Sequence, residues 1–140
     1  MSLRSPGKPD PPIPTPPLPT GAELDILAVL WRRGPSTVRE VHEALGKESG
    51  YTTTLKQMQL MTEKRLLRRS ERFRSHIYEA GAPREQTQSQ LAGDLLRRAF
   101  GGSASNLVLG ALAAEPTSSQ ELREIRRMLD EFEKKGRGSR

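Results

Sequence analysis

The chain has 140 residues, of which 23 are Lys or Arg, 17 are Asp or Glu, and none is Cys. This length suits one ordinary domain or two very small ones. Without cysteine there can be no disulfide, no thiolate zinc site and no cysteine nucleophile. With His42 and His76 as the two histidines, a histidine metal site is not expected. The sequence therefore predicts no metal and no cofactor.

The charge and hydropathy of the chain indicate where it acts and on what. No apolar run approaches the roughly 20 residues of a membrane-spanning helix, so membrane insertion is not expected. Residues 1–4 lead into prolines without an apolar signal segment, which makes the cytoplasm the expected location. A net charge of +6 and an isoelectric point near 10.2 point to a polyanionic partner.

The N-terminal segment 1–19 holds eight of the eleven prolines. Proline fixes φ and removes the amide donor, so this segment is predicted to be a disordered, proline-rich tail. Residues 14–17 fit a PxxP ligand pattern, but such matches arise by chance in proline-rich sequence. We therefore favour a solvated tail over a specific ligand.

Two capping boxes predict two short helices after the tail. Thr20 with Glu23 opens the first helix, which Gly34-Pro35 ends, and Thr37 with Glu40 opens the second. The apolar positions at helical spacing are Leu24, Leu27, Leu30 and Trp31 in the first helix, and Val38, Val41 and Leu45 in the second. Trp31 is expected in the core, and residues 46–50 form a turn.

A third helix is predicted from Tyr51 to about residue 66. Its apolar side is formed by Thr54, Met58 and Met61. The opposite side carries Thr52, Thr53, Lys56 and Gln59. Leu60 leans toward this second side, where it could touch a thymine methyl group, but core packing fits it equally well. Three consecutive threonines are weak helix formers, so packing must hold the first turn.

A charged hairpin is predicted after the third helix. The runs 67–70 and 75–78 are strand-like and flank a tip at 71–74, and Gly81-Ala82-Pro83 then forms a linker. Six cations are opposed only by Glu71 in this stretch: Lys64, Arg65, Arg68, Arg69, Arg72 and Arg74. Three helices and a hairpin in about 60 residues are the layout of a winged helix-turn-helix, here residues 20–80.

In a winged helix the third helix lies in the major groove of DNA, and the hairpin, called the wing, contacts the phosphate backbone of the DNA. The recognition helix is assigned to 51–65 and the wing to 67–80. Threonine can bond phosphates or bases, Lys56 can reach guanine or phosphate, and Gln59 can pair with adenine. The candidate DNA contacts are Thr52, Thr53, Lys56 and Gln59 on the helix, and Arg72, Arg74, Ser75 and His76 on the wing.

Residues 84–135 are predicted to be purely helical and to form a dimer. The segment 107–112 is apolar on almost every side, and the roughly 57 residues from 84 to 140, in three helices, cannot enclose it. A symmetric second copy would supply the missing cover. The candidate interface residues are Leu95, Phe100, Leu107, Val108, Leu109, Leu112, Ile125 and Leu129. Residues 136–140 are expected to be a disordered basic tail. The whole fold class is thus mainly α with a small β-hairpin wing.

Catalytic patterns are absent from the sequence. It has no GxGxxG or Walker-type loop and no serine in an elbow motif. Its carboxylates sit on charged helices, where they pair with Arg or Lys three or four positions away. The sequence predicts no catalytic residues and no enzyme.

Several motifs occur in an order that resembles the penicillinase-repressor family, known by its BlaI and MecI members. The resemblance covers roughly residues 18–133. The matching stretches are 27–31 with 34–41, the recognition-helix runs 51–56 and 61–67, the wing run 74–78, and 107–109 before the last helix. It implies a homodimeric transcriptional repressor that binds a two-fold symmetric DNA operator on the bacterial nucleoid. It also adds Tyr51 to the candidate DNA contacts.

The resemblance carries one further implication, about induction. In the best-known members a membrane sensor protease system leads to cleavage in the dimerisation region. The corresponding candidate cleavage region here is Leu109, Gly110 and Ala111. Gly110-Ala111 stands where those members have Asn-Phe, so proteolytic induction is left open. The copper-responsive branch carries C-terminal cysteines, which this chain lacks.

Three other readings fit the residues. The first is a nucleoid-type protein that coats DNA without sequence preference. The second is a winged helix used as a protein-interaction module. The threonines at the start of the third helix favour base contact over both. A ligand-gated repressor is the third, although nothing polar converges on the middle C-terminal helix.

Overall fold

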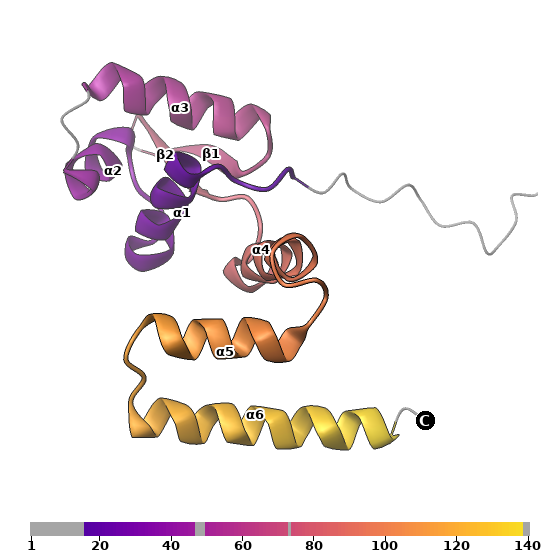
Figure 1. The fold of residues 1–140 in the computed structure, drawn as a ribbon. Helices are drawn as coiled ribbons and strands as arrows, with labels where there is room; N and C mark the ends of the chain where they lie inside the picture. The colour runs from indigo at the N-terminus through magenta and orange to yellow at the C-terminus, as the bar shows by residue number, and fades with distance from the viewer. Residues whose placement is uncertain (1–15, 47–49, 73, 139–140) are drawn as a thin grey trace, which may run out of the picture. The chain divides into compact units, whose positions relative to one another are not determined.

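The computed structural model describes residues 16–46, 50–72 and 74–138, and Figure 1 shows their ribbon. The elements in chain order are α1 (Gly21–Arg33), α2 (Val38–Leu45), α3 (Tyr51–Glu63), β1 (Leu67–Arg72), β2 (Ser75–Ala80), α4 (Arg84–Arg98), α5 (Ala104–Ala114) and α6 (Ser119–Gly138). The predicted class, mainly helical with one β-hairpin, is confirmed. Of the predicted tail 1–19, residues 1–15 lie outside the described part of the chain, and so does half of the PxxP match.

The chain divides into two compact units. The first runs to Leu91 and the second from Ala92, so the division falls inside α4. The segment 81–83, for which the sequence indicates a linker, lies earlier, between β2 and α4. At the other end α6 reaches Gly138, into the segment 136–140 for which the sequence favours a disordered tail.

The helices α1 and α2 begin where the sequence predicts, because both capping boxes form. The Thr20 hydroxyl accepts a hydrogen bond from the backbone amide of Glu23, and the Glu23 carboxylate accepts one from the backbone amide of Thr20. Thr37 and Glu40 form the same pair of hydrogen bonds. The core of the first unit is built from α1, α2, α3 and the hairpin. Its buried apolar residues are Ile26, Leu27, Val29, Leu30, Val38, Val41, Met58, Met61, Leu66, Leu67 and Tyr78. Trp31 packs against this cluster but is only partly buried.

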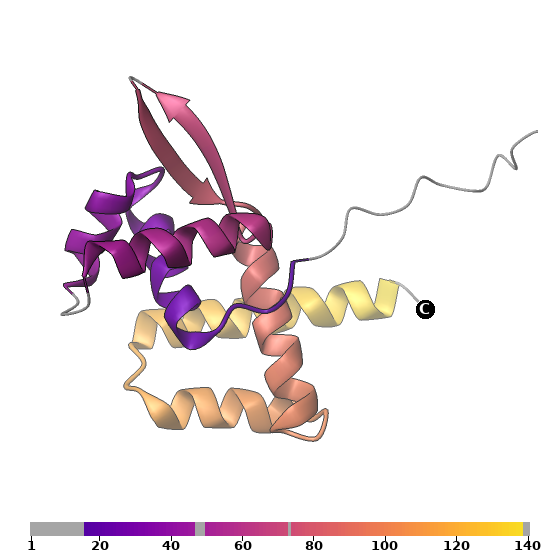
Figure 2. The ribbon, with the colours of Figure 1, turned by 90° about the horizontal axis from the view of Figure 1, so that it is seen from above.

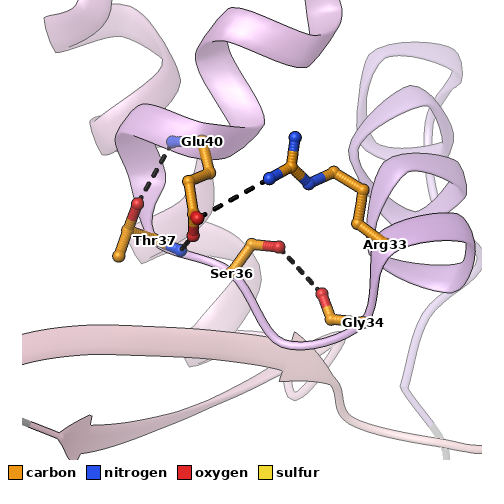
Figure 3. A network of polar contacts seen from close by, with 5 residues as sticks. All are labelled: Arg33, Gly34, Ser36, Thr37 and Glu40. Atoms are coloured by element: carbon orange, nitrogen blue, oxygen red, sulfur yellow. Dashed lines mark hydrogen bonds and ion pairs between the residues drawn. The ribbon is translucent and has the colours of Figure 1, made fainter.

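A single β-bridge, which the sequence did not predict, ties the hairpin to the turn between α1 and α2. Ser36 and Tyr78 exchange both backbone hydrogen bonds, at 2.9 and 2.8 Å. Figure 3 shows the surrounding turn, in which the Ser36 hydroxyl donates to the Gly34 carbonyl and Arg33 lies 3.6 Å from Glu40. The Thr37 amide is the main cause that lowers the pKa of the Glu40 carboxyl, with the Arg33 charge contributing less. This turn fixes where the wing leaves the helical body.

The end of α3 differs from the sequence prediction. The helix was expected to continue to residue 65 or 66, but it ends at Glu63. Arg65 has a left-handed φ of 69°, and the amides of Arg65 and Leu66 bond the carbonyls of Thr62 and Met61. These bonds form a Schellman cap with arginine at the position that usually holds glycine. The cap turns the chain so that Leu66 and Leu67 enter the core.

The hairpin has longer strands and a shorter tip than predicted. Its antiparallel register runs from Leu67 opposite Ala80 to Arg72 opposite Ser75. The predicted tip 71–74 is therefore corrected, since residues 71 and 72 belong to β1. Arg74, with a φ of 65°, makes the tight turn. Figure 2 shows the hairpin extending beyond the three helices of the first unit.

The second unit has no interior of its own. Among residues 92–136 of the described chain, not one is buried. Its largest exposed apolar side chains are Leu95, Val108, Leu109, Leu112, Met128, Leu129 and Phe132. The helix α4 ends at Arg98, and Gly101 and Gly102 follow it with left-handed φ values.

Candidate nucleic-acid interface

The recognition-helix face predicted from the sequence is exposed as a continuous surface of α3. Thr54, Met58 and Met61 are buried in the core, which turns the opposite side outward. That side presents Thr52, Thr53, Lys56, Gln59 and Leu60, all of them exposed. Leu60 is 44% exposed, so the structure decides against core packing for this residue.

The first turn of α3 is held by side chains rather than by helix propensity. Gly50 is the N-cap and offers no side-chain hydrogen bond. The buried Thr54 hydroxyl instead lies 2.9 Å from Nδ1 of His42 on α2. The rings of Tyr51 and His42 pack in a T-shaped arrangement with their centroids 6.1 Å apart, and the Arg39 guanidinium lies 5.1 Å from the centre of the Tyr51 ring. These contacts fix the orientation of Tyr51 at the start of the helix.

A groove of about 390 Å³ lies between the start of α2, the start of α3 and β2. Three predicted contact residues, Tyr51, Ser75 and His76, line it together. Arg39 also lines the groove, and the sequence analysis missed it. In the sequence, the feature that could have indicated Arg39 as a DNA contact is its position as a cation in the first turn of α2, the helix before the recognition helix. The other lining residues are Thr37, Val38, Leu55 and Tyr78.

The cations of the wing are less uniform than their sequence suggests. Lys64 pairs with Glu23 of α1 at 2.7 Å, and Arg68 pairs with Glu79 on the neighbouring strand. Glu71 is the one acidic residue within the stretch 64–74, but two of its six cations pair with acidic residues outside it. Four arginines make no ion pair within the described part of the chain and are exposed, namely Arg65, Arg69, Arg72 and Arg74. Of these, Arg72 and Arg74 lie at the tip of the hairpin, Arg69 lies within β1, and Arg65 lies between α3 and β1.

The pair between Glu23 and Lys64 has a structural role instead. Glu23 is 4% exposed, and its carboxylate also accepts the Thr20 amide at 3.0 Å. Burial acts to raise the pKa of Glu23, but the Lys64 hydrogen bond and charge and the Thr20 amide lower it by more. The net pKa lies below its usual value, so the carboxylate stays ionised and links the start of α1 to the end of α3.

The remaining predicted site residues lie in the second unit. Five of the eight candidate interface residues are exposed: Leu95, Val108, Leu109, Leu112 and Leu129. Phe100, Leu107 and Ile125 are half-buried. Met128 and Phe132 were not in the predicted set, although Phe132 is 73% exposed. The candidate cleavage region Leu109, Gly110 and Ala111 lies inside the helix α5.

No group of three or more His, Asp or Glu side chains in the described part of the chain is arranged to hold a metal ion. None of its helices has both the length and the apolar character needed to cross a bilayer.

The fold, the exposed polar face of α3 and the arginines of the hairpin define a winged-helix DNA-binding protein. Residues 19–131 match the family model of the penicillinase repressor. The chain is also 31% identical, over 121 residues, to the transcriptional regulator BlaI of two Mycobacterium tuberculosis strains, CDC 1551 / Oshkosh and H37Rv. The alignments cover 84% of this chain and 86% of each relative.

The chain therefore belongs to the penicillinase repressor family, as the order of its sequence motifs predicts. Membership makes it a DNA-binding transcriptional repressor.

Proposed function

We propose that the protein is a homodimer that represses transcription by binding a two-fold symmetric operator. Each subunit inserts the exposed face of α3, from Thr52 to Gln59, into one major groove, and Arg72 and Arg74 grip the flanking backbone. The half-sites then lie about one helical turn apart or a multiple of it. Such binding places the protein on the nucleoid, in the bacterial cytoplasm, where it blocks the polymerase at an overlapping promoter.

One observation carries this proposal. Four polar side chains stand exposed on α3, and one of them is the cation Lys56. Four exposed arginines, Arg65 just after α3 and three on the hairpin, have no ion-pair partner in the described chain. Phosphate contacts supply nonspecific affinity, whereas specificity requires contacts to base edges. The arginines can contact phosphates, and the exposed face of α3 can contact base edges.

A DNase footprint on the DNA upstream of the protein's own gene tests operator binding. At about 0.15 M salt nonspecific binding is weak, so a short protected site with two-fold symmetry is expected. Uniform protection across the fragment would favour the DNA-coating alternative. No protection there or in a genome-wide binding screen would favour the protein-interaction alternative.

The role of Lys56 separates base reading from phosphate binding. If Lys56 neutralises a phosphate, Lys56→Ala should weaken binding to all DNA sequences equally. It should also reduce the slope of log affinity against log salt concentration by about one unit. If it reads a base, the variant should lose preference for the operator instead. The exposed Glu63, at the end of the same helix, gives a control variant, Glu63→Ala. Lys56→Ala with unchanged affinity, slope and preference would remove Lys56 from the interface.

The dimer is proposed from the second unit. An amphipathic or apolar helix needs cover, and α5 has no buried residue in the described chain. Leu109 is 66% exposed at its centre. Leu109→Asp should give monomers and lose most of the operator affinity, because two linked half-site contacts act at high effective concentration. Asn106→Asp adds the same charge at an exposed polar position of α5 and should leave the dimer intact.

Sedimentation of both variants decides this assignment. A Leu109→Asp protein that still sediments as a dimer would overturn the role of α5.

A sensor protease remains a proposed partner, with residues 109–111 as its target. Exposed loops are the usual sites of proteolytic cutting, whereas this stretch is helical. Cleavage therefore requires local opening of α5, and it should be slower in the operator-bound dimer than in the free protein. Mass spectrometry of the fragments after incubation with the cognate protease locates the cut, and fragments ending elsewhere would remove residues 109–111 from this role.

A further inference from the structure

The exposed face of α3 contains an apolar feature that phosphate binding does not explain. A shallow hollow of about 290 Å³ lies on this face, with Leu60 at one end. Thr52, Thr53, Lys56 and Gln57 complete its lining. The threonines contribute methyl groups as well as hydroxyls, and Leu60 contributes an isobutyl group that is 44% exposed.

The chemistry of the hollow restricts what can occupy it. Lys56 lines the hollow, on the face of α3 that is assigned to DNA, so its partner is expected to be polyanionic. In the major groove of DNA, guanine, cytosine and adenine present hydrogen-bond donors and acceptors. Thymine alone adds a methyl group at C5. A leucine facing that groove therefore gains its largest apolar contact against thymine.

We propose that this hollow reads the C5-methyl group of one thymine in each operator half-site. Leu60 and the threonine methyls contact the methyl group, and Lys56 at the rim is left to bind an adjacent guanine edge or phosphate. This inference rests on the proposed function, since it assigns specificity to the same helix face. It identifies Leu60, an apolar residue, as a determinant of operator choice.

Deoxyuridine gives a selective test, because it pairs like thymine and lacks only the methyl group. Preferred sites are first selected from random duplexes with the full-length protein. Each thymine of the selected site is then replaced in turn by deoxyuridine, and the affinity is measured. One thymine per half-site should lose about fourfold in affinity, the factor that corresponds to burying one methyl-sized group. Replacing it in both half-sites should cost roughly fifteenfold.

Two variants connect the effect to Leu60. In Leu60→Ala the uridine and thymine operators should bind almost equally, because the methyl group has lost its partner. Gln59→Ala is the matched control, since Gln59 is exposed on the same face but does not line the hollow. It should keep the full uridine penalty. Because Leu60 is exposed, its truncation should leave the fluorescence of the single tryptophan, Trp31, unchanged.

The outcomes separate this inference from the proposed function. A selected operator whose thymines all tolerate uridine, or a Leu60→Ala protein that keeps the uridine penalty, would overturn the thymine assignment while operator binding stands. A changed sedimentation of Leu60→Ala with an unchanged penalty would place Leu60 in a protein contact and overturn it as well. If selection returns no preferred sequence, both the inference and the operator proposal fail.

Discussion

Replacing Glu23 by Gln tests how the first unit is held together. The substitution keeps the size of the side chain and removes its charge. In the wild type, one oxygen of the Glu23 carboxylate accepts a hydrogen bond from the backbone amide of Thr20 at 3.0 Å. The other oxygen accepts one from the Lys64 ammonium group at 2.7 Å. Glu23 is buried, whereas the Lys64 side chain is 43% exposed. The pair therefore joins an interior anion to a cation that water still reaches.

The size of the effect follows from this asymmetry. A hydrogen bond to a charged group contributes about 1.5–3 kcal/mol to stability. The amide of Gln can still accept from Thr20, and water screens the Lys64 end. We therefore expect Glu23→Gln to lower the free energy of unfolding of the first unit by about 1–2 kcal/mol at neutral pH.

The pH dependence gives a more specific signature than the loss itself. The pKa of Glu23 lies below its usual value in the folded chain, so the unfolded state binds the proton more readily. Its contribution is present above the unfolded pKa of about 4.3 and is lost as the pH falls through the folded pKa. The difference in stability between wild type and Glu23→Gln should thus be constant near neutrality and shrink in acid.

Trp31 makes the measurement selective. It is the single tryptophan of the chain and packs against the core of the first unit, so its fluorescence reports urea unfolding of that unit. Glu43→Gln, at an exposed position of α2, is the control for removing one negative charge and should leave the urea midpoint unchanged. Equal midpoints of Glu23→Gln and wild type at pH 7, or a difference that persists unchanged down to pH 3, would refute the reasoning.

Two backbone predictions use the same assay. Arg65→Gly should raise the free energy of unfolding by about 0.5–1 kcal/mol, because glycine takes the left-handed φ of 69° without strain; a lower urea midpoint would contradict it. Gly81→Ala should lower it by about 1–3 kcal/mol, because the new Cβ would lie 2.4 Å from the carbonyl oxygen of Arg65. Gly21→Ala, with open space around the new Cβ, is its control and should cost nothing; equal midpoints for the two alanine variants would refute the steric argument.

The features that the sequence predicted correctly depend on neighbouring residues. Each capping box joins residues three positions apart, so Thr20 with Glu23 and Thr37 with Glu40 could be read directly. The buried and exposed faces of α3 follow from a period of 3.6 residues, which fixes which side chains share a side once one side is buried. The apolar character of 107–112 likewise predicted a helix without cover.

The features that were missed depend on contacts between distant segments. Lys64 and Glu23 are 41 positions apart, and only packing of α3 against α1 turns a wing cation into an internal ion pair. The same packing draws Leu66 into the core and ends α3 at Glu63, with Arg65 in a left-handed conformation that no local residue preference indicates.

The sequence by itself determined the order of the elements, the helix starts and the polar face of the third helix, since each follows from short-range hydrogen bonds and periodicity. The tertiary structure alone decided that Leu60 faces outward, that Arg39 joins Tyr51 and His76 at one groove, and which cations of the wing stay unpaired within the described chain. Those outcomes depend on how segments far apart in the chain approach each other in space, which side-chain spacing does not encode.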